Sequence, residues 1–113
     1  MTNEPCPWEI DVQAVKQLLD SGADFTLLDC REPGEYQAAN ITGSKLIPMR
    51  EIPGKLGELE PLKNSHIVVH CHHGGRSMRV TQWLREQGFS QVQNMAGGID
   101  AWSQIVDPSV PRY

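Results

Sequence analysis

Apolar residues along this 113-residue chain alternate between short, nearly continuous runs and runs with helical spacing. Short continuous runs are typical of strands that are buried on both faces. They occur at residues 25–30 (FTLLDC), 45–48 (KLIP) and 66–70 (HIVVH), and a last strand is expected near residues 92–95 (VQNM). Because helical spacing separates these runs, the pattern predicts βαβ units and a mostly parallel sheet with helices on both faces.

Two helices are predicted most clearly. The first follows Asp11, a favourable N-cap residue, and ends at Gly22. Its apolar face consists of Val12, Val15, Leu18 and Leu19. The second is expected over residues 77–87, with Gly88 at its end. Its apolar face consists of Val80, Trp83 and Leu84.

Shorter helices are expected at three further places. Pro33 suits a first helical turn, so a short helix should follow Glu32. Apolar residues at helical spacing predict another over residues 52–59, although two glycines oppose it. A turn at Gly97 and Gly98 should lead into a last short helix that carries Ile99 and Trp102. We expect all three tryptophans, Trp8, Trp83 and Trp102, to pack in the core.

Candidate chemistry concentrates in the loop between the clearest strand and the clearest helix. Cys71 begins this loop, which reads CHHGGRS through Ser77. Ligands in parallel sheets gather at the carboxyl ends of strands, where a helix N-terminus offers unpaired N–H groups. Gly74 and Gly75 permit torsions that turn successive N–H groups inward as an anion-binding nest.

A thiol in such a nest should be acidic, because the helix dipole, the N–H groups and the nearby Arg76 favour the thiolate. The alternative is that Cys71 is simply a buried small side chain, as free cysteines often are. Its position favours the reactive role. Cys30 should be a buried, inert thiol within its strand, whereas Cys6 lies in a polar segment.

Composition narrows the class of protein. The charge of −4 arises from 10 basic and 14 acidic residues, and dispersed basic residues argue against nucleic-acid binding. The sequence offers no apolar run near the roughly 20 residues that span a membrane. Residues 1–11 resemble no secretory leader, so we expect one cytoplasmic domain without membrane partners. Three cysteines without zinc-finger or redox-pair spacing argue against a disulfide scaffold.

Four consecutive residues, His70, Cys71, His72 and His73, are of types that bind metals. Neighbours on an extended strand point to opposite faces and do not easily converge on one ion, so no metal is expected. We expect no organic cofactor either. The two loop histidines, His72 and His73, either shape the entrance to the site or are simply solvated side chains.

Several motifs together resemble the single-domain rhodanese-like sulfurtransferases. They are residues 27–36 (LLDCREPGEY), 41–44 (ITGS), the loop from Cys71 to Ser77 and residues 96–102 (AGGIDAW). The resemblance runs from about Trp8 to Trp102 in the family's order. It implies a single rhodanese-like domain over residues 1–113, with a core at about 8–102 and short tails. The implied fold has three layers, α/β/α, around a mostly parallel sheet of about five strands.

The resemblance also implies roles for individual residues. Cys71 matches the cysteine that carries sulfane sulfur as a persulfide. The loop residues His72, His73, Gly74, Gly75, Arg76 and Ser77 match the surrounding substrate-binding loop. Arg76 either binds substrate anions or clamps the loop to a nearby carboxylate, and its place in the loop favours the second role. Asp29 and Arg31 match a charged pair that supports the structure. The chain departs from the family at Asn40, where a histidine is frequent, and at the loop histidines, where basic or small residues are common.

Loop length distinguishes two enzyme classes. Related cysteine phosphatases use a C-x5-R loop, whereas Arg76 closes a C-x4-R loop here. The smaller ring suits one transferable sulfur atom, so we expect a sulfurtransferase. It would move sulfur from a thiosulfate-like or persulfide donor through Cys71 to cyanide or a thiol. A second hypothesis is a sulfur-carrier or sensor module that serves a protein acceptor. A third, disfavoured by the loop length, is a small phosphatase or arsenate reductase.

Overall fold

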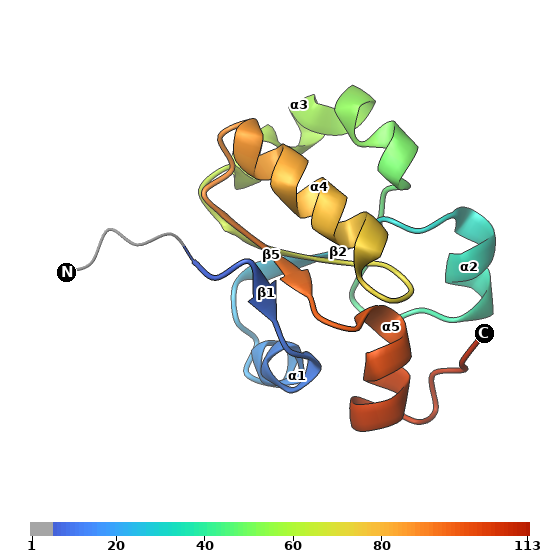
Figure 1. The fold of residues 1–113 in the computed structure, drawn as a ribbon. Helices are drawn as coiled ribbons and strands as arrows, with labels where there is room; N and C mark the ends of the chain where they lie inside the picture. The colour runs from blue at the N-terminus through green and yellow to red at the C-terminus, as the bar shows by residue number, and fades with distance from the viewer. Residues whose placement is uncertain (1–5) are drawn as a thin grey trace.

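The structure is a computed structural model that describes residues 6–113. Residues 1–5 lie outside the described residues. The prediction that residues 1–11 are not a secretory leader therefore falls partly on this segment. The fold is a five-stranded sheet in the order β1-β5-β4-β2-β3, with every pair parallel (Figure 1). The strands are β1 (Glu9–Ile10), β2 (Phe25–Asp29), β3 (Lys45–Leu46), β4 (His66–His70) and β5 (Gln91–Met95). This confirms the predicted parallel sheet.

An α-helix follows each of the five strands along the chain. These helices are α1 (Val12–Asp20), α2 (Pro33–Ala38), α3 (Leu56–Leu59), α4 (Gly75–Glu86) and α5 (Gly98–Ala101). Asp11 caps α1, since its carboxylate accepts a 2.7 Å hydrogen bond from the N–H of Ala14. A capping box between Glu32 and Glu35 begins α2.

Two apolar cores lie on opposite faces of the sheet. Successive strand residues point to opposite faces, so Leu28 packs in one core and Leu27 in the other. The first core joins the sheet to α4 through Val80 and Leu84. The second joins it to α1, through residues such as Val15, and to α5. These layers form the predicted α/β/α arrangement.

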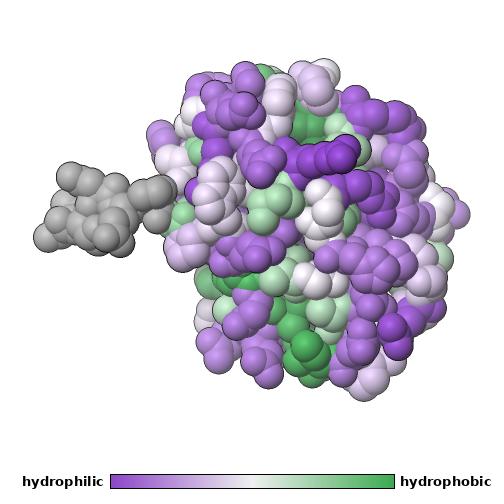
Figure 2. All heavy atoms as spheres, in the orientation of Figure 1, coloured by the Kyte–Doolittle hydropathy of each residue, from purple (hydrophilic) through white to green (hydrophobic). Residues whose placement is uncertain are grey.

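On the face drawn in Figure 2, hydrophilic side chains cover most of the surface and hydrophobic ones appear in smaller groups. Among residues 6–113, no helix has the length and apolar character needed to cross a membrane.

The expected helix over residues 52–59 is broken. Two short 3₁₀ turns, Met49–Glu51 and Pro53–Lys55, precede the four-residue α3, and a third, Glu60–Leu62, follows it. Proline lacks the N–H that an uninterrupted ladder needs, and glycine weakens helices, so only single turns form. Ile52 and Leu59 are nevertheless buried, which explains the apolar spacing.

The ends of the chain also differ from expectation. Trp8 is 47% exposed instead of buried, and the guanidinium of Arg85 lies 3.9 Å from its ring centroid. Trp102 is buried as predicted. The packed structure continues past residue 102, through a π-helical turn at Trp102–Val106, to Val110 in the core. Packing therefore extends beyond the expected limit of the core.

Candidate active site

Cys71 lies immediately after β4, at the bottom of the loop that leads into α4. Gly74 is the N-cap of α4 and has a φ of 113°, a backbone conformation that favours glycine over all other residues. Cys71 itself is 1% exposed. The strand and the helix therefore fix the thiol inside the loop, as the sequence predicts.

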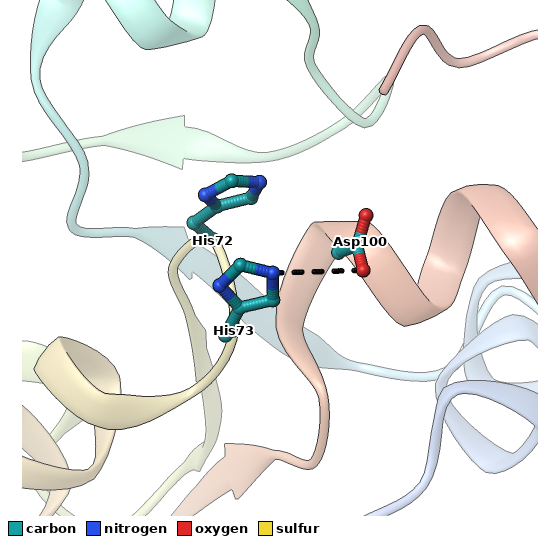
Figure 3. Close-up of side chains that lie close together, drawn as sticks. All are labelled: His72, His73 and Asp100. Atoms are coloured by element: carbon teal, nitrogen blue, oxygen red, sulfur yellow. Dashed lines mark ion pairs between the residues drawn. The ribbon is translucent and has the colours of Figure 1, made fainter. Parts of the chain in front are cut away.

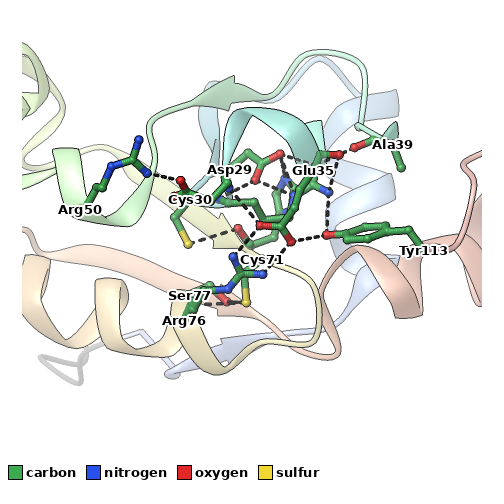
Figure 4. A network of polar contacts seen from close by, with 12 residues as sticks. Asp29, Cys30, Glu35, Ala39, Arg50, Cys71, Arg76, Ser77 and Tyr113 are labelled. Carbon is green, nitrogen blue, oxygen red and sulfur yellow. Dashed lines mark hydrogen bonds and ion pairs between the residues drawn. The ribbon is translucent and has the colours of Figure 1, made fainter. Parts of the chain in front are cut away.

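Three donor groups surround the Cys71 sulfur, and Figure 4 shows Ser77, which provides two of them, beside it. The N–H groups of Gly74 and Ser77 lie 3.1 and 3.4 Å from Sγ, and the Ser77 hydroxyl lies 3.3 Å from it. The Ser77 hydroxyl also contacts the side-chain oxygen of Asn94, so its single proton is shared between two acceptors. This is the nest of inward N–H groups that the glycine-containing loop predicts.

The surroundings lower the pKa of Cys71 to about 4. The largest cause is a hydrogen bond from the Cys30 thiol, and burial opposes it. Hydrogen bonds from the side chain and backbone of Ser77 and the backbone of Gly74 lower the pKa further. Cys71 is therefore a thiolate at neutral pH, which is the nucleophilic form of cysteine.

Arg76 holds the loop against α2. Its two terminal nitrogens lie 2.7 and 2.9 Å from the two carboxylate oxygens of Glu35. This bidentate pair lowers the pKa of Glu35 to about 2. The charge of Arg76 is thus matched by Glu35. The sequence predicts that Arg76 favours the Cys71 thiolate, but the hydrogen bonds from Cys30, Ser77 and Gly74 lower the pKa of Cys71 more than the Arg76 guanidinium does.

His72 and His73 lie at the outer side of the loop, with stacked rings whose centroids are 4.0 Å apart. The other face of His72 stacks on Tyr113 at 4.1 Å. His73 is exposed, and its Nε2 lies 3.6 Å from a carboxylate oxygen of Asp100 (Figure 3). The structure thus places both rings beside the C-terminal segment.

The metal argument needs one correction. His70 and Cys71 do point to opposite faces of β4, and burial lowers the pKa of His70 to about 4. His72 and His73, however, leave the strand direction, and together with Asp100 they bring three possible ligand atoms within 4.8 Å of one another. Arg112 already binds the Asp100 carboxylate at 2.8 Å, so we interpret this group as an ion-pair network.

Asp29 and Arg31 form a completely buried ion pair below the loop. Arg31 donates three side-chain hydrogen bonds to the Asp29 carboxylate, the shortest at 2.6 Å. It also donates to the carbonyl of Ala39 at 2.7 Å and to the hydroxyl of Tyr113 at 2.9 Å. The pair therefore joins β2, the end of α2 and the C-terminus of the chain.

Gly98 fixes the loop from the other side. The N–H groups of Ile99 and Asp100 donate to the carbonyls of Cys71 and His72 at 2.9 and 3.1 Å. A Cβ at Gly98 would lie only 2.4 Å from the His72 carbonyl oxygen. A glycine is needed here because two backbone segments pass so close together.

Four residues of the site were not found by sequence reasoning in these roles: Cys30, Glu35, Asn94 and Tyr113. Cys30 could have been found from strand register, because it aligns with Cys71 when β2 and β4 are paired. The contacts of the other three join segments far apart in the chain, and no local pattern marks them.

We expect Ser77→Ala to raise the pKa of Cys71 by about 1, since one hydroxyl hydrogen bond to the thiolate is lost while the backbone donors remain. Iodoacetamide alkylation rates measured across pH give the midpoint. Cys6→Ser is the control and should leave the midpoint unchanged. An unaltered midpoint in Ser77→Ala would mean that the hydroxyl donates to Asn94 instead of to the thiolate.

Comparison with known proteins agrees with this geometry. A family model for the rhodanese-like domain matches residues 11–105. The rhodanese-like/PpiC domain-containing protein 12 of Arabidopsis thaliana is 44% identical over 91 residues. The match covers 77% of this chain and 30% of that protein, so the chain spans less than a third of this relative.

Two further proteins match over most of both lengths. A sulfurtransferase of Allochromatium vinosum is 34% identical over 96 residues, which cover 85% of this chain and 88% of the relative. The human single-domain sulfurtransferase TSTD1 superposes with a TM-score of 0.78 at 25% identity, covering 88% of this chain and 97% of TSTD1. Together with the match to residues 11–105, these comparisons show that the chain belongs to the rhodanese-like family.

Proposed function

We propose that this protein is a sulfurtransferase that carries sulfane sulfur as a persulfide on Cys71. The observation that carries the proposal is the buried Cys71 sulfur among the N–H groups of Gly74 and Ser77, where its pKa is about 4. A thiolate with fixed donors around it can attack sulfur and then stabilise a second sulfur anion in the same place.

The reaction consists of two displacements at sulfur. The Cys71 thiolate first attacks the outer sulfur of the donor, so a new S–S bond forms while the remainder of the donor leaves as an anion. For a thiosulfate-like donor this leaving anion is sulfite. Cyanide or a thiolate acceptor then attacks the outer sulfur, and the Cys71 thiolate is regenerated. Neither step moves a proton, so no metal, cofactor or general base is required.

Two features favour sulfur over phosphate as the transferred group. Only four residues separate Cys71 from Arg76, which leaves a tight loop. The Arg76 guanidinium is also bound at both ends by Glu35, so it is not free to hold phosphate oxygens. A phosphatase of this loop type needs its arginine for the phosphoryl group.

The stacked rings of His72 and His73 lie at the outer side of the loop that holds Cys71. We propose that these rings affect donor capture and leave the displacement at Cys71 unchanged. The natural acceptor is a small thiophile or a protein, and either fits the second displacement.

Parallel assays of the purified chain test this function. We expect turnover of a sulfane donor with cyanide or dithiothreitol as acceptor, and aryl phosphate hydrolysis near background. Insertion of a glycine between Gly74 and Gly75 should weaken sulfur transfer, because it widens the ring around the persulfide. Cys71-dependent hydrolysis of aryl phosphates by the native chain, without sulfur transfer, would refute the proposal.

A further inference from the structure

A second cysteine lies beside Cys71 across the sheet. Asp29 of β2 pairs with His70 of β4, and the next residues along these parallel strands are Cys30 and Cys71. The ladder continues to this point, because the N–H of Cys30 donates to the carbonyl of His70 at 3.1 Å. The two cysteines are therefore lateral neighbours at the carboxyl ends of adjacent strands (Figure 4).

This register places the pair within the range that a disulfide needs. Neighbouring strands lie about 4.8 Å apart, whereas disulfides join Cα atoms roughly 4.4–6.8 Å apart. Residues in register on adjacent strands point to the same face of the sheet. Accordingly, Cys30 and Cys71 belong to the same apolar core, together with Leu28 and Val69 on that face.

The Cys30 thiol has few competing partners. It is 1% exposed, and its sulfur lies 3.5 Å from the carbonyl oxygen of His70. Its single proton can go to that carbonyl or to the Cys71 sulfur, and a charged acceptor is the stronger of the two. The proposed sulfur transfer uses Cys30 only as a hydrogen-bond donor to the Cys71 sulfur and not as a nucleophile.

We propose that Cys30 is a resolving thiol, which forms a disulfide with Cys71 after a hydroperoxide has oxidised Cys71. This modification goes beyond the proposed sulfur transfer. It requires only that Cys71 is a reactive thiolate, whatever group Cys71 normally transfers.

The two steps balance as follows. The Cys71 thiolate attacks one peroxide oxygen, so an S–O bond forms, the O–O bond breaks and the alkoxide or hydroxide leaves; Cys71 is then a sulfenic acid. Cys30 loses its proton and attacks the Cys71 sulfur, so the S–S bond forms and hydroxide leaves with that proton as water. Two thiols have lost two electrons, and the peroxide has gained them.

The charge state of Cys71 affects how readily Cys30 ionises. In the resting site the pKa of Cys30 is raised far above its ordinary value by its hydrogen bond to Cys71, by burial and by the Cys71 charge. Cys30 therefore stays protonated while Cys71 is a thiolate. A sulfenic acid is neutral, so oxidation of Cys71 removes the hydrogen bond to the thiolate and the Cys71 charge, whereas the burial of Cys30 continues to raise its pKa. A Cys71 persulfide keeps a negative charge on its outer sulfur. Cys30 therefore stays protonated beside it and forms no disulfide while the site carries sulfur.

Intact-mass and peptide mapping after treatment with hydrogen peroxide test the proposal. The native chain should lose ~2 Da relative to its reduced form, contain a Cys30–Cys71 cross-linked peptide, and regain Cys71 alkylation after dithiothreitol. Cys30→Ser should instead gain two or three oxygen atoms on Cys71, and dithiothreitol should restore less than about a tenth of its alkylation. Cys30→Ala is a second variant of the same kind, and Cys6→Ser is the control expected to behave as the native chain.

Several results would overturn the proposal. They are a disulfide that joins Cys71 to Cys6, oxygen addition to Cys71 in the native chain, or full recovery of Cys30→Ser by dithiothreitol. These measurements use mass and alkylation instead of sulfur transfer. A chain that forms the disulfide but transfers no sulfur would refute only the proposed function. A chain that transfers sulfur but forms no disulfide would refute only the role of Cys30 as a resolving thiol.

Discussion

Replacement of Cys71 by serine is expected to lower sulfur transfer by roughly three orders of magnitude or more, because removing the nucleophile of a covalent mechanism leaves only binding. A serine hydroxyl ionises far less readily than the thiol and forms no persulfide. The measurement is turnover with saturating donor and cyanide, compared between the native chain and Cys71→Ser.

Cys6→Ser is the matched control for this variant. Cys6 is half-buried near Arg85, whose guanidinium contacts its carbonyl at 3.0 Å, and it lies outside the loop of Cys71. The control should retain full turnover. Retention of more than a tenth of the native turnover by Cys71→Ser would show that another group carries the sulfur.

Replacement of Arg31 by leucine should produce the largest loss of stability, about 3–5 kcal/mol, because it leaves the buried Asp29 carboxylate uncompensated. The variant also loses the hydrogen bonds of Arg31 to Ala39 and Tyr113. Natural domains have only about 5–15 kcal/mol of stability in total, so this change should bring the fold close to its limit. Urea unfolding followed by circular dichroism measures the difference.

Two comparisons make this prediction specific. Lys16→Ala removes one partner of the exposed Lys16–Asp20 pair and should cost about 1 kcal/mol or less. Combining Arg31→Leu with Asp29→Leu should cost less than the sum of the two single changes, because no unpaired charge remains. A loss for Arg31→Leu no larger than that for Lys16→Ala would contradict the structural role of the pair.

The sequence predicts those parts of the fold that depend on local pattern. The strand 66–70 and the helix that follows it were predicted because apolar runs and helical spacing are local, and the position of Cys71 between them follows directly. The parallel sheet follows from the alternation of such elements. The glycine-containing loop likewise predicts the N–H groups of Gly74 and Ser77 around the thiol.

Other features depend on contacts between distant segments. β1 has only two residues and exists because β5 pairs with it, so no pattern indicates it. The exposure of Trp8 reflects a partner, Arg85, that is 77 residues away in the chain. The Arg76–Glu35 and Arg31–Tyr113 contacts are of the same kind. The helix predicted over residues 52–59 was wrong, because backbone constraints at proline and glycine outweigh apolar spacing.

The most direct test of the central claim is the intact mass of the chain after incubation with a sulfane-sulfur donor and removal of excess donor. We expect a gain of one sulfur atom, ~32 Da, on the native chain and none on Cys71→Ser. Cyanide or dithiothreitol should remove it, which distinguishes a persulfide from two added oxygen atoms. A native chain that turns over donor and acceptor without acquiring a cyanide-labile sulfur on Cys71 would contradict the account.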